Sequence, residues 1–470
     1  MENHVHNVKT IVESLGKKII DIDWYDNIYE WLGWYKGKVD DFHNYFTYNG
    51  HTRVNRTRYS MQMPKIISED WATLLYNDRT EIKVKEAQQP TLDGILEDNR
   101  FKSRYSNFIE MMMALGIGAI TEYKDEKGDP KMNFIIAPMV FPIRVEHGEI
   151  VDCIFASVQG DEYYVNIHEK QRNGDYKISN KYFSFNTDNK PAQKNKEGIQ
   201  KEFTSKVKLF QIFKPCIANN VDVFTPFGVS VYANAIDRVK ACDLIYDSLR
   251  NEFVLGKKRI FLREDLVDYK PIVREDGTSI NVPTFDNNDV EFYSLPTDEG
   301  IAGEQIHEVN MTLRTQEHIN ALQSELNMLS DACGLGNDRY NFQTGNVYTN
   351  TSQVISTQSK LYKTLLKHEK ELRGSMIEMV RALLYLKNNT EYKDDVTVDF
   401  DDSIIEDSTE IQRRALLELN SGVIDKVEYI MQVYKYTEDQ AKEFIDEIDN
   451  RILEEQKKMA PKEPDLEDEI

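Results

Sequence analysis

Apolar residues recur at intervals of three and four over most of residues 304–386, which predicts two long helices joined by a polar loop. The stripe of the first helix consists of Ile306, Val309, Leu313, Ile319, Leu322, Leu326 and Leu329, and that of the second of Leu361, Leu365, His368, Leu372, Met376, Val380 and Leu383. Gly334 and Gly336 are placed to end the first helix. A helix over residues 352–386 would be about 50 Å long, so we expect other elements to lie beside it.

Charge distinguishes these two helices. Acidic residues dominate the first, where Arg314 is the one base among residues 304–331, whereas lysine and arginine dominate the second. Opposite charges favour antiparallel pairing of the two helices within one chain, or a ring in which the basic helix of each copy packs on the acidic helix of its neighbour. Two helices of an ordinary bundle are the simpler alternative.

The N-terminal part of the chain has helical periodicity with many aromatic residues. Helices are predicted within residues 23–46, over 64–75 and over 92–116, and Pro64 suits the opening of the second. Between the first two, Arg53, Arg56 and Arg58 form a short basic cluster. We interpret the cluster as part of a solvated loop, and a contact with DNA or with an acidic partner is the alternative.

From residue 117 onward the apolar pattern alternates, as is typical of strands. We expect an antiparallel meander with one buried face. A polar, aperiodic segment, residues 187–201, is predicted to be a loop. The expected strands cover residues 117–123, 132–136, 141–145, 150–157, 163–168, 176–185 and 207–213.

The second half of the chain returns to helices around a small strand-rich insert. A helix is predicted from Phe227 to about Leu255, followed by strands and a hairpin about Asp276 and Gly277 within residues 259–300. After the second long helix we expect a short strand, two further helices and a disordered acidic tail. These cover residues 396–400, 407–420, 437–456 and 458–470.

The chain has 470 residues and a formal net charge of −22, over half of which comes from the C-terminal region. Such a charge opposes nonspecific attraction to phosphates, so a DNA partner would be passed along and not held tightly. No apolar run reaches the ~18 residues of a membrane span and no secretory signal pattern is present, so we expect a soluble protein. The scattered cysteines indicate a reducing compartment instead of disulfides or zinc.

The sequence lacks the motifs of nucleotide and metal chemistry, so we expect no enzyme, no cofactor and no metal site. There is no P-loop, Gly116 to Gly118 is best interpreted as the entry to a strand, and His368 as a core histidine. The remaining enzymatic hypothesis is a magnesium-dependent nuclease, because acids two residues apart on a strand share a face. Its candidate ligands are Asp21, Asp23, Asp26, Asp399, Asp401 and Asp402.

Three stretches of sequence, in this order, match a known family. They are residues 65–72 with Leu74 and Leu75, residues 227–230 leading into Asp237 and Asp243, and residues 256–261 at the end of a predicted helix. Together with the order of the predicted elements, they make nearly the whole chain resemble the portal proteins of long-tailed bacteriophages. The resemblance implies an α+β portal-type fold with a helical and antiparallel-β wing, a long-helix stem, a small strand-rich clip and a helical crown.

The resemblance also implies boundaries and site residues. The expected parts are a wing (1–225), a stem helix (226–256), a clip (257–303), a second stem helix (304–333), a tunnel loop (334–351), a long helix with a return strand to the wing (352–400), crown helices (401–457) and the tail (458–470). The tunnel-loop residues implied to face DNA are Asn337, Asp338, Arg339, Tyr340, Asn341, Phe342, Gln343 and Thr344. Lys257, Lys258 and Arg259 would lie near the junction of stem and clip, where they meet DNA or a neighbouring subunit.

The function implied by the resemblance is structural. Portal proteins form a homo-oligomeric ring, usually of twelve subunits, at one capsid vertex, and double-stranded DNA enters and leaves through its channel. The implied partners are the major capsid and scaffold proteins, the terminase large subunit and the head-completion adaptor, with no membrane; the implied location is the virion, and the host cytoplasm during assembly. The alternatives are another ring- or tube-forming phage structural protein, or the acidic-site nuclease.

Overall fold

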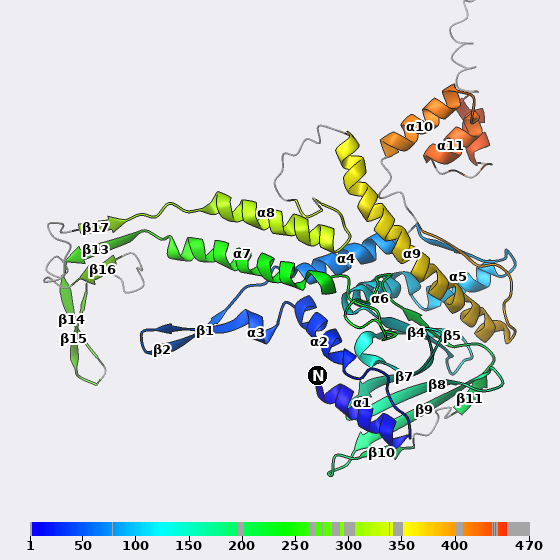
Figure 1. Cartoon of the computed structure of the whole chain (residues 1–470), viewed down its shortest axis with the longest axis horizontal. Coiled ribbons are helices and arrows are strands. Elements are labelled where there is room, and N and C mark those ends of the chain that lie inside the picture. Colours follow the sequence, from blue (N-terminus) through cyan, green and yellow to red (C-terminus); the bar gives the residue numbers. More distant parts are fainter. Residues whose placement is uncertain are drawn as a thin grey trace, which may run out of the picture. The chain divides into compact units, whose positions relative to one another are not determined.

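The computed structural model divides the chain into two compact units, Met1–Asp399 and Phe400–Ile470. Helices and mainly antiparallel sheets are both present (Figure 1), which confirms the predicted α+β class. The structure describes residues 2–77, 79–195, 202–263, 268–274, 276–283, 292–295, 306–337, 339–341, 351–400, 408–434, 436, 438 and 440–448.

The N-terminal helices are α1 (Glu2–Ser14), α2 (Trp24–Tyr35), α3 (Asp40–His43), α4 (Met63–Leu75), α5 (Gln89–Asp98) and α6 (Phe101–Leu115). The single helix predicted over residues 92–116 is wrong, because the chain turns between α5 and α6. Arg100 has a left-handed φ of 49°, which interrupts the helix. The side chain of Asn99 closes the break by donating to the carbonyl oxygens of Ile95 and Pro130, at 2.8 and 3.0 Å.

The basic cluster of residues 51–58 belongs to a hairpin of strands β1 (Asn44–Asn49) and β2 (Thr52–Thr57), so the predicted loop is wrong there. Of the helix or pair of helices expected within residues 23–46, the pair is confirmed: α2 ends at Tyr35 before Gly37, and the short α3 precedes β1. Gly50 has a φ of 61° at the tight turn, a conformation that glycine adopts without steric cost.

The predicted meander is divided between two sheets. The larger has the order β10-β9-β8-β7-β6 with β11 paired to β9, and the smaller has the order β12-β4-β5. The division falls at a 3-10 turn, Ala137–Met139, whose proline ends β5 and redirects the chain. The strands are β4 (Gly118–Lys124), β5 (Pro130–Ile136), β6 (Val140–Glu146), β7 (Glu149–Gln159), β8 (Glu162–Lys170), β9 (Tyr176–Phe185), β10 (Pro191–Lys194), β11 (Glu202–Ser205) and β12 (Phe210–Phe213).

Two strands, β10 and β11, lie where a loop or no element was predicted. β10 falls within the polar segment 187–201, so the loop prediction is wrong for part of it, and residues 196–201 lie outside the described residues. Backbone pairing with β9 forms both strands, and pairing of this kind leaves little trace in the side-chain pattern at an exposed sheet edge.

Aromatic side chains bind the small sheet to its neighbours on both faces. Phe210 of β12 contacts Phe155 and His168 of the larger sheet, with ring centroids 5.5 and 5.2 Å apart. Phe213, at the other end of β12, meets Phe108 of α6 edge-on at 5.4 Å. The core of this unit therefore has three layers: the larger sheet, the small sheet and α6.

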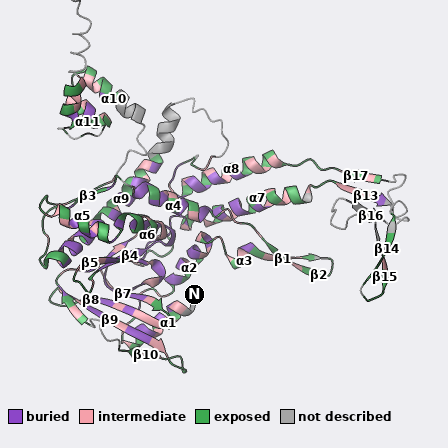
Figure 2. Ribbon diagram, turned by 180° about the vertical axis from the view of Figure 1, so that it is seen from behind, coloured by how far each residue is buried: buried purple, intermediate pink, exposed green. Residues whose placement is uncertain are grey.

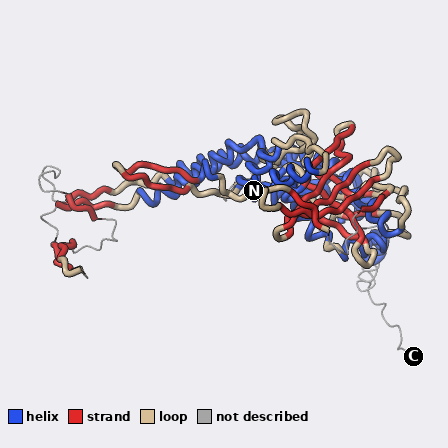
Figure 3. Tube along the Cα trace, turned by 90° about the horizontal axis from the view of Figure 1, so that it is seen from below, coloured by secondary structure: helices blue, strands red, loops and turns tan. Residues whose placement is uncertain are grey.

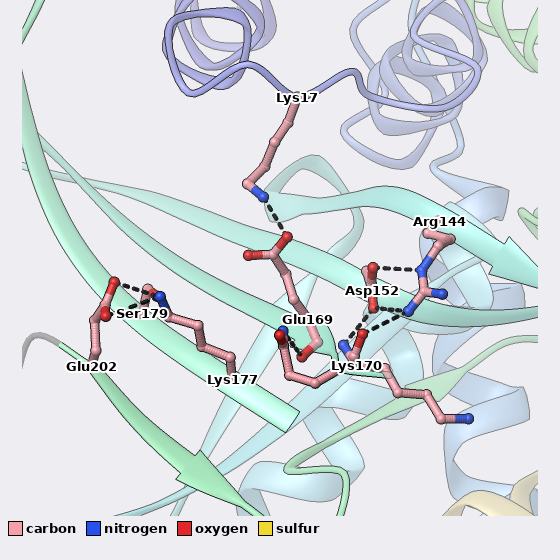
Figure 4. Close-up of polar contacts among 9 residues, drawn as sticks. Lys17, Arg144, Asp152, Glu169, Lys170, Lys177, Ser179 and Glu202 are labelled. Carbon is pink, nitrogen blue, oxygen red and sulfur yellow. Dashed lines mark hydrogen bonds and ion pairs between the residues drawn. The ribbon is translucent and has the colours of Figure 1, made fainter. Parts of the chain in front are cut away.

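Polar contacts tie α1 to one end of the larger sheet (Figure 4). Lys17, just beyond α1, forms an ion pair with Glu169 of β8. Arg144 of β6 donates to both carboxylate oxygens of Asp152 in β7, at 2.7 and 3.0 Å, and Asp152 also accepts the backbone N–H of Lys170 at 2.7 Å. Three neighbouring strands and the N-terminal helix are thereby fixed to one another.

The second long helix is confirmed as α9 (Thr351–Asn388), which lies beside β12 and donates from Ser375 Oγ to the carbonyl oxygen of Ile212 at 2.7 Å. After α9 the predicted short strand is also confirmed: β18 (Thr397–Asp399) pairs antiparallel with β3 (Glu81–Lys83). The buried side of α9 (Figure 2) packs on α4, α5 and the small sheet.

The first long helix is shorter than predicted. α8 covers Thr315–Ala332, and Ile306–Val309 form strand β17 instead, because their backbone pairs antiparallel with β13 (Arg259–Arg263). α8 lies along α7 (Ile236–Leu255), so the predicted pairing of the acidic and basic helices along their length within one chain is wrong (Figure 1). The contact of α8 with α9 is at its C-terminal end, where Lys360 Nζ lies 2.6 Å from Asp331 Oδ1. At the far end of the α7–α8 pair, β16 (Phe292–Leu295) pairs parallel with β13, and the expected hairpin is β14 (Tyr269–Val273) with β15 (Ser279–Pro283).

Two glycines determine where α7 can begin. The helix predicted from Phe227 starts only at Ile236, because residues 227–232 run against the C-terminal end of α6. A Cβ on Gly116, the left-handed cap of α6, would lie 2.7 Å from the carbonyl oxygen of Gly228, and a Cβ on Gly228 would overlap the backbone of Gly116. The N–H of Val231 then bonds to the carbonyl of Met113 at 3.0 Å. Gly116 therefore lies at the entry to strand β4, as predicted. It also allows the close backbone contact with Gly228, which was not predicted.

The second unit is helical. It contains α10 (Ser408–Asn420), α11 (Lys426–Tyr434) and a helical segment over residues 440–448. Gly422 follows α10 with a φ of 72°, as predicted for the end of this helix. Helix α11 was not predicted, and the expected tail, residues 458–470, lies outside the described residues.

Replacing Gly228 with alanine is expected to lower the free energy of unfolding by about 1 to 3 kcal/mol, because the new methyl group would overlap Gly116. The measurement is urea denaturation followed by circular dichroism. The matched control is Gly94→Ala in α5, where a Cβ meets no atom within 4 Å; it should be neutral or stabilise by up to about 1 kcal/mol. Equal stability of the two variants would contradict the close approach.

Candidate functional site

Trp71 of α4 joins three parts of the chain that lie far apart in the sequence. Its side chain is 0% exposed, its Nε1 donates to the carbonyl oxygen of Cys333 beyond α8 at 3.1 Å, and its ring meets His368 of α9 edge-on at 4.8 Å. His368 Nδ1 accepts the N–H of Cys216 at 3.0 Å, and burial lowers the pKa of His368 to about 4. The histidine is therefore a neutral core residue, as predicted.

The predicted DNA-facing loop begins directly beyond this junction. Arg339 NH2 lies 3.2 Å from Asp70 Oδ1 in α4, and the carbonyl oxygen of Tyr340 accepts from Gln323 Nε2 in α8 at 3.2 Å. Burial, and then the negative charge of Asp70, raises the pKa of Tyr340, so its phenol stays protonated. The structure thus holds Arg339 and Tyr340 against α4 and α8 of their own chain.

The other predicted loop residues are placed only in part. Asn337 is exposed and Asn341 is half-buried. Asp338, Phe342, Gln343 and Thr344 lie outside the described residues.

The basic cluster of Lys257, Lys258 and Arg259 lies where α7 ends and β13 begins. Lys257 and Lys258 are exposed, and Arg259 is half-buried at the start of the strand. The ammonium of Lys258 lies 2.7 Å from Glu308 Oε1 in β17. One charge of the cluster is therefore balanced within the chain.

Two ion pairs join α7 to α8. Near the sheets, Arg238 NH1 donates to Glu325 at 3.1 Å. Near the far end, Glu252 accepts from the side chain of Arg314 at 3.1 and 2.9 Å and from its backbone N–H at 3.1 Å. These hydrogen bonds, first of all those from the Arg314 side chain, lower the pKa of Glu252 to about 2.

The carboxylate of Asp243, on the opposite side of α7, anchors the base of the β1–β2 hairpin. Its side chain is 0% exposed; Oδ2 lies 3.2 Å from His43 Nε2, and Oδ1 accepts the backbone N–H of Met61 at 2.7 Å. One turn further on, Asp247 Oδ1 accepts the N–H of Tyr59 at 3.4 Å. Burial raises the pKa of Asp243, since its partners offset only part of the cost of removing the carboxylate from water.

Sequence reasoning did not assign these contacts. In the sequence, Asp243 enters only through the family resemblance. The available signal is its position directly after Cys242 and four residues after Val239, two buried apolar residues of the same helix. Neither the partner of this acid nor the salt bridge between Glu252 and Arg314, 62 residues apart, follows from local spacing.

The carboxylates proposed for a nuclease gain no metal site from the described part of the chain, where no group of three or more His, Cys, Asp or Glu side chains is placed to hold an ion. Asp399 instead forms an exposed ion pair with Lys83 of β3 at 3.1 Å, and Asp401 and Asp402 lie outside the described residues. The four cysteines are free. Among the helices that the structure describes, none has the length and apolar character needed to cross a bilayer.

Comparison with protein families decides the family of this chain. A sequence model described as "Phage portal protein, SPP1 Gp6-like" matches residues 17–459. The chain belongs to this portal family. The match includes α7, α8, α9 and the loop between α8 and α9. All the contacts described in this section therefore lie within the residues that match the family.

Two solved structures are reported as similar to this portal-family chain. One is described as "Neck of native GTA particle computed with C12 symmetry", with a TM-score of 0.42, 11% identity, and coverage of 79% of this chain and 88% of that chain. The other, "Virion of native gene transfer agent (GTA) particle", has a TM-score of 0.39 with the same identity and coverage. The comparison with curated proteins found no match.

Replacing Glu252 with glutamine is expected to reduce stability in a pH-dependent way. Because the pKa of Glu252 is lowered from 4.5 to about 2, its carboxylate stabilises the folded state above pH 4.5, and this contribution is lost as the pH falls toward 2. Urea denaturation of wild type and Glu252→Gln at several pH values should therefore show a difference in unfolding free energy near neutral pH that shrinks below pH 4.5.

The control for this experiment is Glu126→Gln, which removes an exposed carboxylate from the turn between β4 and β5 and leaves α7 and α8 unchanged. It should give a smaller difference from wild type at neutral pH. A difference for Glu252→Gln that stayed constant from pH 7 to 2 would mean that the ion pair with Arg314 does not form in solution.

Proposed function

We propose that this chain is a portal subunit whose copies assemble into a ring at one vertex of a phage capsid. The match to the portal family over residues 17–459 carries the proposal. Twelve is the expected subunit number, as is usual in the family. DNA would pass through the central channel during packaging and ejection, and the ring would be part of the virion.

The domain assignment follows the order of elements. We assign the sheets and N-terminal helices to the wing (1–225), α7 and α8 to the stem (226–256 and 304–333), residues 257–303 to the clip, and residues 401–457 to the crown. In support, α7 and α8 extend together from the sheets and carry β13, β16 and β17 at their far end (Figures 1 and 3). A paired helical stalk that ends in a small strand module suits a stem and a clip.

The tunnel loop, residues 334–351, is assigned to the channel wall, with Asn337 to Thr344 nearest DNA. Asp70 balances the charge of Arg339 at the start of this loop. A wall without net positive charge suits a channel, because strong phosphate binding by each of many subunits would hold a duplex that has to slide. The large negative charge of the chain acts in the same direction.

The remaining roles are those of a structural protein without catalysis. The terminase large subunit would supply the energy for packaging, and the head-completion adaptor would dock on the ring after packaging. The major capsid and scaffold proteins would surround the ring during assembly in the host cytoplasm. In support of a structural role, ion pairs near both ends of the α7–α8 pair hold the two helices together.

Purified full-length chain is expected to form a ring of about twelve subunits, the number usual in the portal family, because portal subunits close head to tail around an axis. Native mass spectrometry gives the subunit number, and negative-stain microscopy should show a toroid with a wide body and a narrow stalk. A chain that remained monomeric at micromolar concentration and above would contradict the proposal. A continuous tube would instead favour the alternative of a tube-forming phage protein.

The ring is expected to bind duplex DNA no more tightly than about 1 µM at physiological salt, because its charge opposes phosphate attraction. Fluorescence anisotropy with a labelled duplex tests this. The variant Asp70→Asn releases the charge of Arg339 and should bind more tightly, with a steeper dependence on salt. Salt-sensitive, submicromolar binding by the wild-type ring would overturn the picture of a non-adhesive channel.

A further inference from the structure

The β1–β2 hairpin projects from the N-terminal helices beside α7 (Figure 1), and two of its large side chains are exposed. Phe46 is 50% exposed and Tyr48 is 68% exposed. A two-stranded hairpin is marginally stable in water unless another surface covers one of its faces. The exposed aromatic residues therefore indicate that a partner supplies this cover.

One face of the hairpin is an organised surface. In an antiparallel pair, directly opposed residues share a face, and the register sets Phe46 opposite Asn55 and Tyr48 opposite Arg53. The Arg53 guanidinium lies over the Phe46 ring at 4.1 Å, and the rings of Phe46 and Tyr48 meet edge-on at 5.9 Å. We refer to Phe46, Tyr48 and Arg53 as the aromatic face.

The base of the hairpin, unlike the exposed aromatic face, is held by contacts with α7. The buried Asp243 contacts His43 and Met61. The Arg250 guanidinium lies 3.9 Å from the centroid of the Tyr59 ring, and the backbone N–H of Tyr59 bonds to Asp247. Burying a carboxylate costs free energy, so its use at this point indicates that the direction of the hairpin relative to α7 matters.

The hairpin and α8 lie on different sides of α7. Asp243 and Asp247 face the hairpin, whereas Arg238 and Glu252 face α8. Arg238 and Asp243 are five residues apart, as are Asp247 and Glu252, and five residues correspond to about 140° around an α-helix. A surface on one side of a subunit that binds a different surface on the other side of the next copy is a heterologous contact, and such contacts form a ring when the rotation between copies closes.

The charges on the two surfaces are complementary. Residues 44–59 contain three arginines and no acid, in a chain with a net charge of −22, and one of the three, Arg53, lies on the aromatic face. The exposed side of α8 carries the acid Glu317 with the small or flexible residues Asn320, Ala321, Ser324 and Met328, while Arg314 at its start is held by Glu252. An arginine and aromatic face fits such a surface by charge and by the space that small side chains leave.

We propose that the aromatic face of each hairpin packs on the exposed side of α8 in a second copy of this chain. This inference rests on the proposed ring and names one of its subunit contacts. The hairpin of each copy reaches past its own α7 to the next subunit, so every stem helix pair is held from one side by its own ion pairs and from the other by a neighbour. The basic cluster of the hairpin then binds protein, and DNA is the competing outcome.

Site-specific photocrosslinking in the full-length ring tests the contact. With p-benzoylphenylalanine in place of Tyr48, irradiation should link subunits into dimers and larger products, and peptide mapping should locate the link within Thr315–Ala332. The matched control places the same photoprobe at Phe42, which is half-buried against Trp34 and Arg58 of the same chain, so its links should stay within one chain.

A charge exchange gives an independent readout. Arg53→Glu should raise the protein concentration needed for half-maximal ring formation on the order of tenfold, and Glu317→Arg in the same chain should restore it. Sedimentation velocity measures both. Because Arg53 and Glu317 are exposed, each single variant is expected to keep the circular dichroism spectrum of the folded wild-type subunit.

The outcomes separate this inference from the proposed function. If wild type forms rings but the Tyr48 probe links only within its own chain, to another part of the neighbour or to added duplex DNA, the hairpin contact is overturned and the portal assignment stands. If wild type forms no ring, both fail. Rings together with intersubunit links to α8, and restoration by the charge exchange, support the contact.

Discussion

The backbone contact between Gly116 and Gly228 determines where the packed body of this protein ends and its long helix pair begins. No side chain fits between the end of α6 and the segment before α7, so the two backbones meet directly and Val231 bonds to Met113. The start of α7 is fixed by this approach. Because α8 pairs with α7 and the β1–β2 hairpin is anchored to it, the direction of both follows from the same contact.

Carboxylates on different sides of α7 bind different neighbouring elements. Glu252 binds Arg314 on the side of α8, and Asp243 and Asp247 hold the base of the hairpin on the other side. A helix of 20 residues buries too little apolar surface along its outer half to hold two neighbours by packing alone, and several of its large apolar residues remain exposed there. Directional hydrogen bonds to charged groups replace the missing burial and specify one arrangement.

Charge balance also distinguishes the proposed DNA-facing surfaces from the proposed protein-binding surface. Near the proposed channel, Arg339 is balanced by Asp70, and at the clip Lys258 is balanced by Glu308. The hairpin is the contrasting case, since its three arginines have no acid in their own segment. A positive surface on an acidic chain attracts another copy of that chain, which is the partner present at the highest local concentration in an assembling ring.

The sequence by itself determined the α+β class, the long helix α9, most strands of the sheets and the portal resemblance, because periodic burial and turn residues are local signals. Tertiary contacts decided the rest. Ile306 and Val309 have helical spacing but become a strand by pairing with β13, and α8 lies beside α7 although its charges suggested α9. Asp243 pairs with His43, which is 200 residues away, and no local sequence pattern predicts such a contact.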